Sequence, residues 1–322
     1  MKRLREREII RIITKQFTNQ LGLPLGFDDD VAAIPFSSKT WIILKTDMLV
    51  GSTDVPPGMT VQEAARKAVV ATVSDFAAKG VQPRALIVSI GLPAPAKQKM
   101  VQDLARGLSQ AVLEYRCKII GGDTSQADDL VIGIAGVGFA NPKRLLRRNA
   151  AQIGDVVAVT GPFGRAAAGL RILMSKEGKD RAGYPSLVSA VLRPKARLAE
   201  GIILANSGGV TSSIDSSDGL AWSLHQLAKA SRKDIKLHTI PIPTGLQTYA
   251  NKNRLSAMGL ALYGGEEYEL VVTVKPRRFS DLRELVPSLR RIGIVEKGDG
   301  KVEAQFGGKR IRVKEQGWEH FA

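Results

Sequence analysis

The chain has 322 residues, of which 44% are hydrophobic and 24% charged, as in a globular protein long enough for two hydrophobic cores. No stretch approaches the roughly 18 apolar residues of a membrane-spanning helix, and the single cysteine, Cys117, excludes an internal disulfide, so we predict a cytoplasmic protein. The net charge of +16 could indicate nucleic-acid binding, but the basic residues are scattered without interleaved aromatic residues. A solvated basic surface is therefore the favoured interpretation, and a nucleic-acid partner is not expected.

The chain begins with a predicted helix and an acidic loop. Residues 1–17 carry many charges and no apolar signal-peptide core, so they predict an amphipathic helix. The Gly/Pro-rich segment 21–34 places Asp28, Asp29 and Asp30 directly before an apolar strand. Because side chains alternate along an extended chain, at most some of these acids point the same way. A polar turn and a ligand-binding loop both remain open.

Three β-prone segments end on an aspartate. Residues 41–47 end on Thr46 and Asp47, residues 118–123 end on Asp123, and residues 210–215 end on Asp215. If these strand ends converge, the repulsion between carboxylates must be offset by protons or cations. Mg²⁺ with a polyphosphate fits this arrangement, because Mg²⁺ prefers a few carboxylates together with phosphate oxygens and waters.

Residues 60–80 predict the clearest helix. Thr60 and Glu63 have the spacing of a capping box, and Gly80 can serve as the C-terminal cap. Projected at 100° per residue, Asp75 falls inside the apolar stripe of this helix. A buried carboxylate needs a partner, for which an ion pair with an arginine and contact with a metal ion are the two candidates.

The next elements are a second amphipathic helix over residues 97–115 and a strand over residues 130–139, which we expect to pair with the strand before Gly121. A basic connection then begins at Asn141 and Pro142. We place the domain boundary there, giving domains of residues 1–145 and 146–322.

The second half predicts a strand over residues 155–160 and then a glycine-containing turn, residues 161–165, before a helix over 166–174. Such a turn can bind a phosphate, but it matches neither the P-loop pattern nor the dinucleotide-binding fingerprint, so close strand-to-helix packing is favoured. A further helix is predicted over residues 194–206. Another predicted helix starts at Ser217 or Asp218. It contains His225, which we interpret as packed or exposed and not as catalytic.

The C-terminal third continues with a strand over residues 263–274, a helix over 279–285 and a hairpin turn at Gly307 and Gly308. Strands and helices occur in mixed order in both halves of the chain. We therefore predict an α/β fold of the mixed α+β kind, with two sandwich-like units in place of one doubly wound sheet.

Five segments in this order resemble the thiamine-monophosphate kinase family of the aminoimidazole ribonucleotide synthetase-like superfamily. They are TDMLV at residue 46, VSDFAAKG at 73–80, IIGGDT at 119–124, SIDSSDGL at 213–220 and GGEEYEL from 264. The resemblance covers nearly the whole chain. It implies a two-domain ATP-binding fold in which each domain is a mixed sheet packed with helices, and a homodimer formed by the N-terminal halves.

The implied activity is ATP-dependent phosphorylation of thiamine monophosphate to thiamine diphosphate, with ATP and Mg²⁺ as cofactors and no protein nucleophile. The N-terminal domain would bind metal and ATP and form the dimer, and the C-terminal domain would add metal and substrate residues. The resemblance implies metal ligands Asp30, Thr46, Asp47, Asp75, Asp123, Asp215 and Asp218, ATP contacts from Gly122, Asp123, Arg148 and Ser217, and substrate contacts from Asp54, Glu266 and Trp318.

The chain departs from the family pattern at Asp54, where many members have histidine, and at Glu267 in GEEYEL, where GEDYEL is usual. Another acceptor within the same superfamily is therefore an alternative, as is a basic nucleic-acid-binding protein with an inactive nucleotide fold. Cys117 lies at neither end of the chain, unlike the reactive cysteine expected of a selenophosphate synthetase or a hydrogenase maturation factor.

Overall fold

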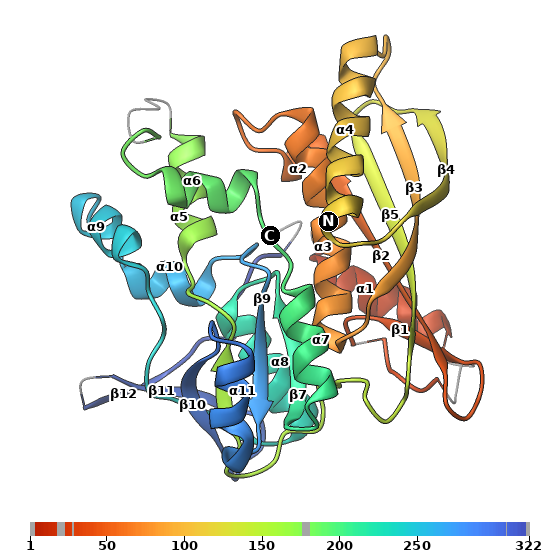
Figure 1. Ribbon diagram of the computed structural model, residues 1–322. Coiled ribbons are helices and arrows are strands. Elements are labelled where there is room, and N and C mark those ends of the chain that lie inside the picture. The colour runs from red at the N-terminus through yellow and green to blue at the C-terminus, as the bar shows by residue number, and fades with distance from the viewer. Residues whose placement is uncertain (1–3, 18–22, 28, 176–180, 307, 320–322) are drawn as a thin grey trace.

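The computed structural model describes residues 4–17, 23–27, 29–175, 181–306 and 308–319, and within them two mixed β-sheets packed with helices (Figure 1). The five-stranded sheet has the order β1 (Ala32–Pro35), β2 (Trp41–Val50), β5 (Val131–Ala140), β3 (Pro83–Leu92) and β4 (Ile119–Gln126). The seven-stranded sheet has the order β12 (Lys309–Arg312), β11 (Val302–Phe306), β8 (Asp234–Leu237), β10 (Arg290–Glu296), β6 (Val156–Val159), β9 (Glu269–Val274) and β7 (Val210–Ser216).

Both sheets contain one parallel pair, β3 with β4 and β8 with β11, among antiparallel pairs. The helices are α1 (Glu6–Thr14), α2 (Gly51–Asp54), α3 (Val61–Lys79), α4 (Gln98–Glu114), α5 (Arg165–Met174), α6 (Pro185–Leu192), α7 (Leu198–Asn206), α8 (Leu220–Ser231), α9 (Thr244–Lys252), α10 (Ala257–Tyr263) and α11 (Phe279–Leu285). The predicted mixed fold is confirmed. None of the described helices is long and apolar enough to cross a membrane.

Helix α3 lies between the two sheets and is buried along most of its length (Figure 1). Thr60 accepts a hydrogen bond from the Glu63 amide at 3.2 Å and Glu63 accepts one from the Thr60 amide at 3.0 Å, which completes the predicted capping box. Gly80 ends the helix with φ of 67°. The helix packs against β2 and β5 on one side and against β7 and α7 on the other, and one hydrophobic core continues across it.

The face of the five-stranded sheet that points away from α3 is apolar and uncovered by the described elements. Met48, Ile87 and Phe139 lie on this face with exposed fractions of 67%, 49% and 54%. We call this surface the outer face. Strand β4 forms one edge of the sheet, and every residue in it is exposed.

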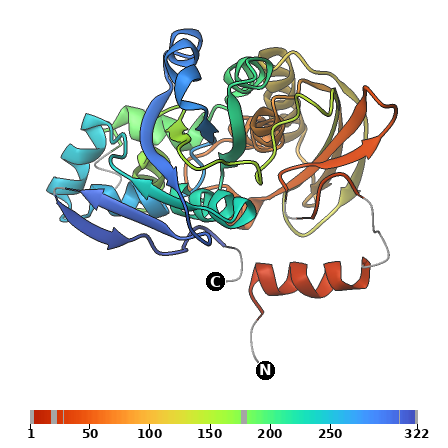
Figure 2. The same cartoon turned by 90° about the horizontal axis from the view of Figure 1, so that it is seen from below.

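Helix α1 lies apart from both sheets, as Figure 2 shows. Its predicted amphipathic character is confirmed, but none of its residues is buried. Arg7 joins it to the body of the protein: the guanidinium stacks 3.3 Å from the ring centre of Trp222 and forms an ion pair with Glu319 at 3.9 Å.

Most predicted elements are present, including the helix of residues 97–115 as α4, the strand of 155–160 as β6 and the helix of 279–285 as α11. The hairpin of β11 and β12 is also present, although residue 307 in its turn lies outside the described residues. The proposed boundary at residue 145 falls in the connection between β5 and β6. The division into two domains stays a prediction.

The prediction that Asp47 and Asp123 end their strands was wrong. Strand β2 continues to Val50 because β5 pairs with it over its whole length, and β4 continues to Gln126 along β3. The predicted pairing of residues 130–139 with the strand before Gly121 was also wrong. The apolar strand β3 lies between them and pairs with both β4 and β5.

Two further element boundaries differ from the sequence interpretation. Helix α8 begins at Leu220 after Gly219, which has φ of 113°, so neither Ser217 nor Asp218 is its N-cap. Strand β9 begins only at Glu269, because Glu266 and Tyr268 adopt φ of 63° and 54° in the preceding loop. Both changes concern residues predicted to bind ligands.

Candidate active site

Three buried aspartates from separate parts of the chain meet beside α3. Asp30 precedes β1, Asp75 lies on α3 and Asp215 lies on β7, and one carboxylate oxygen of each lies within 4.8 Å of the others. Each residue is at most 8% exposed. Asp75 thus has the predicted buried position, and it lies with Asp30 and Asp215, which the family resemblance groups with it. Of the three strand-end acids that could have converged, Asp123 lies elsewhere, on β4. We call these three residues the acidic cluster.

Three cations surround the acidic cluster. Lys45 Nζ lies 2.9 Å from Asp75 Oδ2 and 3.2 Å from Asp47 Oδ1. Lys79 Nζ lies 2.5 Å from both Asp29 Oδ1 and Asp30 Oδ2, and Arg148 Nε donates to Asp30 Oδ1 at 3.1 Å. The partner of Asp75 is therefore a lysine and not the arginine considered above. Three cations do not balance five ionised carboxylates, so a charge deficit remains.

The pKa values of the cluster show how this deficit is met. Burial alone would raise the pKa of Asp30, but Arg148 and Lys79 lower it to about 2. Burial and the charge of Asp30 raise the pKa of Asp215 to about 7, although Ser74 donates a hydrogen bond to its Oδ2 at 2.7 Å. Burial also raises the pKa of Asp75 well above its usual value, against the attraction of Lys45. Without a further cation, protons therefore bind to part of the cluster.

The arrangement fits a divalent cation that prefers oxygen ligands, such as Mg²⁺. Besides the acidic cluster, Asp47 Oδ2 is buried without a hydrogen-bond partner among the described residues. Asp218 is half-buried, and this burial, with the charge of Glu6, raises its pKa to about 6. Buried carboxylate oxygens that lack partners call for such an explanation.

A cleft of about 130 Å³ adjoins these acids. Its walls come from β2, α2, α3, the loop after β7, the loop before β9 and the C-terminal segment, and include Asp47, Asp54, Lys67, Ser217, Asp218, Glu266, Tyr268 and Trp318. All three predicted substrate residues, Asp54, Glu266 and Trp318, line this one cleft together with Asp47 and Asp218. We call it the substrate cleft.

Lys67 connects two of the predicted substrate residues. Its Nζ forms an ion pair with Glu266 Oε1 at 2.5 Å and donates to the Asp54 carbonyl at 2.9 Å. The Asp54 carboxylate in turn accepts from the Val50 amide at 2.7 Å. The side chain of Lys67 is only 4% exposed, so it is held in place while its charged end faces the cleft.

The loop before β9 is fixed by backbone hydrogen bonds. The Glu266 amide donates to the Ser217 carbonyl at 2.6 Å, and the Tyr268 amide donates to the Ser216 carbonyl at 3.1 Å. The Trp318 amide donates to the Asp218 carbonyl at 2.8 Å. Positive φ at Glu266 and Tyr268 is unfavourable for residues other than glycine, and these bonds hold the loop in that conformation.

The glycine-containing turn of residues 161–165 does not serve as an open phosphate site. The Ala166 amide at the start of α5 donates to Glu267 Oε1 at 2.9 Å. Glu267 is buried, which raises its pKa to about 7. The second acid of GEEYEL thus occupies this helix N-terminus, an interaction that the sequence analysis did not predict.

Three predicted ligands, Thr46, Gly122 and Asp123, belong neither to the acidic cluster nor to the substrate cleft of their own chain. Thr46 points to the outer face, because side chains alternate along β2 and Asp47 points inward. Gly122 and Asp123 lie on β4, which is three strands away from β2. A side chain at Gly122 would meet the Val88 carbonyl at 2.1 Å, so this glycine permits close pairing of β4 with β3. Their roles as ligands stay predictions.

Sequence reasoning missed the cations Lys45, Lys67 and Lys79 and the hydroxyl of Ser74. Lys67 and Ser74 lie on α3 outside its apolar stripe and would be expected in solvent, but both are buried because α3 is covered on that side too. Lys79 projects onto the apolar stripe, as the last residue of the helix. Charge balance is the one signal in the sequence that could have identified these lysines, since acids that converge require cations near them.

The comparisons with known proteins agree with this geometry. The family of the AIR synthase related protein, N-terminal domain, matches residues 28–140. A thiamine-monophosphate kinase from Nitrosopumilus maritimus is 39% identical over 325 residues, which cover 100% of both chains. The chain belongs to the thiamine-monophosphate kinase family. A second relative of that name, from Pyrococcus horikoshii, is 35% identical over 99% of this chain and 97% of the relative.

Solved structures of the family have the same architecture. AaThiL complexed with AMPPCP and TMP is 28% identical, with a TM-score of 0.87, and the match covers 99% of this chain and 98% of that one. Hydrogenase maturation protein HypE in complex with ATP, at 20% identity and a TM-score of 0.69 over 96% and 94% of the two chains, shares the fold. The family resemblance and the ATP-binding fold inferred from the sequence are confirmed.

Proposed function

We propose that this protein transfers the γ-phosphate of ATP to thiamine monophosphate and releases thiamine diphosphate and ADP, with Mg²⁺ as the metal cofactor. The observation that carries the proposal is the substrate cleft, which adjoins the acidic cluster and contains all three predicted substrate residues. A family member of the same fold has been solved with AMPPCP and TMP bound.

The cleft has side chains suited to both ends of thiamine monophosphate. The thiazolium ring carries a fixed positive charge, which the carboxylates of Glu266 and Asp54 attract and the half-exposed ring of Trp318 can stack against. Lys67 offers a positive charge for the phosphate end. Because Lys67 also binds Glu266, the two ends of the substrate would be positioned by one connected group of residues.

The polar side of the site would hold the nucleotide. Arg148 would contact a phosphate of ATP and Ser217 would contribute beside it, while Asp30, Asp47, Asp75, Asp215 and Asp218 would hold Mg²⁺. Bound Mg²⁺ would neutralise the charge of the phosphates. Holding the two substrates in line is the main contribution of the protein to phosphoryl transfer.

The reaction needs no nucleophile from the protein. An oxygen of the thiamine monophosphate phosphate attacks the γ-phosphorus of ATP, a new P–O bond forms, and the bond to the β-phosphate oxygen breaks to leave ADP. Lys67 and Arg148 hold the attacking phosphate and the nucleotide by their fixed charges. The deep position of the acidic cluster limits the access of water.

The reaction is tested by product analysis with thiamine monophosphate, free thiamine or no acceptor, each with ATP and Mg²⁺. We expect thiamine diphosphate from the monophosphate alone. Nucleotide binding without any such product would assign the protein to another acceptor of the superfamily, and salt-sensitive RNA binding without ATP turnover would favour the nucleic-acid alternative.

We also propose that two copies pair through the outer face. Exposed apolar patches and an unpaired sheet edge are typical of interaction surfaces, and this face presents both. Pairing of two outer faces would bring Thr46 and Asp123 into the interface. These predicted ligands could then reach a nucleotide although they lie outside the acidic cluster of their own chain.

Light scattering after size exclusion tests the pairing. The protein should have twice the mass of the chain, and Ile87→Glu on the outer face should yield monomers. The matched control is Leu113→Glu on α4, which is 76% exposed but points away from the sheet and should leave the dimer intact. A monomeric wild-type protein would refute the proposal.

A further inference from the structure

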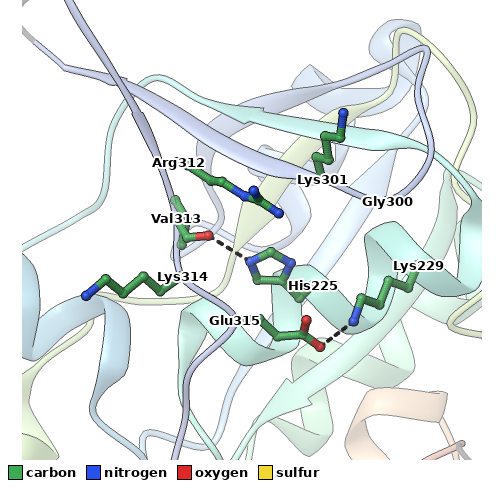
Figure 3. Close-up of a pocket in the computed structure, with 8 residues that line it drawn as sticks. All are labelled: His225, Lys229, Gly300, Lys301, Arg312, Val313, Lys314 and Glu315. Atoms are coloured by element: carbon green, nitrogen blue, oxygen red, sulfur yellow. Dashed lines mark hydrogen bonds and ion pairs between the residues drawn. The ribbon is translucent and has the colours of Figure 1, made fainter.

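A second cavity, of about 470 Å³, lies in the C-terminal half between α8 and the strand pair β11 and β12 (Figure 3). Its size is within the range of small-molecule sites. None of its lining residues belongs to the substrate cleft. Four of them are cationic, and they are contributed by α8, β12 and the segments next to β11 and β12: Lys229, Lys301, Arg312 and Lys314.

The positive charges at this cavity are largely uncompensated. Glu315 is the only acid among the described residues that line it, and it forms an ion pair with Lys229 at 2.5 Å. Among the residues that the structure describes, Lys301 and Arg312 form no ion pair; the acid beside Arg312, Glu303, pairs with Arg310. Cations around a concave surface create a positive potential that favours binding of an anion.

His225 lies at the wall of this cavity and is 95% buried, since its exposed fraction is 5%. Its Nε2 lies 3.0 Å from the Val313 carbonyl oxygen and must donate its hydrogen to it. Its Nδ1 is buried without a hydrogen-bond partner among the described residues. In Figure 3 the imidazole lies between Arg312 and Glu315, with Nδ1 on the side turned away from Val313.

An unsatisfied buried nitrogen is unfavourable, by about 1–3 kcal/mol, unless something binds to it. In the neutral ring Nδ1 accepts a hydrogen bond, and in the protonated ring it donates one. A phosphate group suits both states, because it has acceptor oxygens and, as the hydrogen phosphate, a hydroxyl that can donate. Burial, together with Lys229 and Arg312, lowers the pKa of His225, so a bound anion would favour the protonated ring.

We propose that this cavity is a second binding site, separate from the substrate cleft, for the phosphate group of a small molecule. Lys301 and Arg312 hold the anion by charge, and His225 Nδ1 forms a hydrogen bond with it. Lys229 stays paired with Glu315 at the rim. The proposed reaction does not require the net positive charge of the chain. At this surface, part of that charge serves to bind an anion.

The direct test follows His225 in the full-length protein by its imidazole ¹³Cε1–¹H NMR signal. The chain has only three histidines, so His225→Gln identifies the signal by its loss. Pyrophosphate is added at constant ionic strength with EDTA present, so that no Mg²⁺ supports binding at the acidic cluster. We expect a saturable shift of the His225 signal and none of the signal of the exposed His238.

Calorimetry with matched variants gives the affinity. Lys301→Gln combined with Arg312→Gln should raise the pyrophosphate Kd of this site at least about tenfold, which corresponds to about 1.4 kcal/mol. The control combines Lys297→Gln with Lys309→Gln, which removes the same charge from exposed positions outside the cavity and should change Kd less than about twofold.

Two results would overturn the proposal. One is a His225 signal that does not move or moves without saturation, and the other is an equal loss of affinity in both double variants, which would indicate general charge attraction. Inorganic phosphate, ADP and thiamine diphosphate, titrated in parallel, identify which kind of phosphate compound binds most tightly. Failure here would leave thiamine diphosphate formation unaffected, so the two proposals are tested independently.

Discussion

At the residue scale, the proposed activity depends on the charge of individual side chains, so a neutral group of the same shape should not replace them. Asp47 is such a residue: Oδ1 binds Lys45, whereas the buried Oδ2 has no hydrogen-bond partner among the described residues. Asp47→Asn keeps the volume and removes the charge. We expect kcat to fall by at least about 100-fold, as for loss of a metal ligand, with an unchanged circular-dichroism spectrum.

The control for Asp47 is Asp103→Asn on α4, where the carboxylate forms ion pairs with Lys99 and Arg106 of the same helix. That variant should keep the wild-type rate. A rate for Asp47→Asn within about threefold of wild type would contradict a metal-binding role for Asp47.

Glu266 tests the substrate side of the site. Glu266→Gln removes the charge that attracts the thiazolium ring and weakens the ion pair that holds Lys67. The KM for thiamine monophosphate should rise about tenfold or more while the KM for ATP changes less than about twofold. Steady-state kinetics with each substrate varied in turn measures both, and Glu284→Gln, on an exposed face of α11, is the control. Equal effects on the two KM values would argue against Glu266 as a substrate residue.

At the element scale, α3 carries the site because it is packed on all sides, and its C-terminal end is the most confined point. Gly80 has φ of 67°, and a Cβ there would lie 2.1 Å from the Ala205 side chain and 2.9 Å from the Gly201 carbonyl on α7. Gly154 has a comparable φ of 90° with no atom near its Cβ position. Alanine substitutions at these two positions therefore separate the effect of backbone conformation on stability from the effect of packing.

Gly154→Ala should therefore lower the free energy of unfolding by about 1 kcal/mol, the effect of the left-handed conformation alone. Gly80→Ala should lower it by about 3 kcal/mol, because overpacking against α7 is added. Urea unfolding measured by fluorescence gives both values. Equal losses in the two variants would show that α3 and α7 are not in close contact.

At the scale of the whole molecule, stability should depend jointly on pH and Mg²⁺. The pKa of Asp215 is about 7 in the folded protein and near 3.8 when unfolded, so the folded state binds more protons between these values. Its contribution to stability is complete below about pH 4 and is lost as the pH rises through about 7. Asp30, with a pKa of about 2, acts in the opposite direction, but only at lower pH.

Mg²⁺ should offset this loss, because it binds the ionised carboxylates. The increase in melting temperature on adding Mg²⁺ should therefore grow from about pH 5 to about pH 8, as is expected when metal displaces protons. Asp215→Asn should greatly reduce this dependence. A constant increase across this range in the wild-type protein would contradict the assignment of Asp215 as a metal ligand.

The sequence predicts a large part of this architecture because local signals and tertiary structure agree there. The cap at Thr60 and the burial of Asp75 could be anticipated from local patterns, whereas the grouping of Asp30 and Asp215 with Asp75 follows only from the family resemblance. The role of Lys67 could not, since a lysine off the apolar stripe of a helix is expected in solvent unless both sides of the helix are known to be covered. Nor could that of Lys79, since a lysine in the last turn of a helix is usually a solvated partner of the helix C-terminus. Thr46 and Asp47 cannot both face the acidic cluster, because neighbouring residues of a strand point to opposite faces; the family resemblance grouped them without regard to this alternation. The end of β2 could not be predicted, because it is set by the partner strand β5.

Direct phosphoryl transfer is tested most simply with ATP that is radiolabelled at the γ-phosphate. In the presence of Mg²⁺ and thiamine monophosphate, we expect label in thiamine diphosphate, with one labelled product for each ADP released. In Asp47→Asn the label should appear at least about 100-fold more slowly. Release of labelled inorganic phosphate without labelled thiamine diphosphate would contradict it.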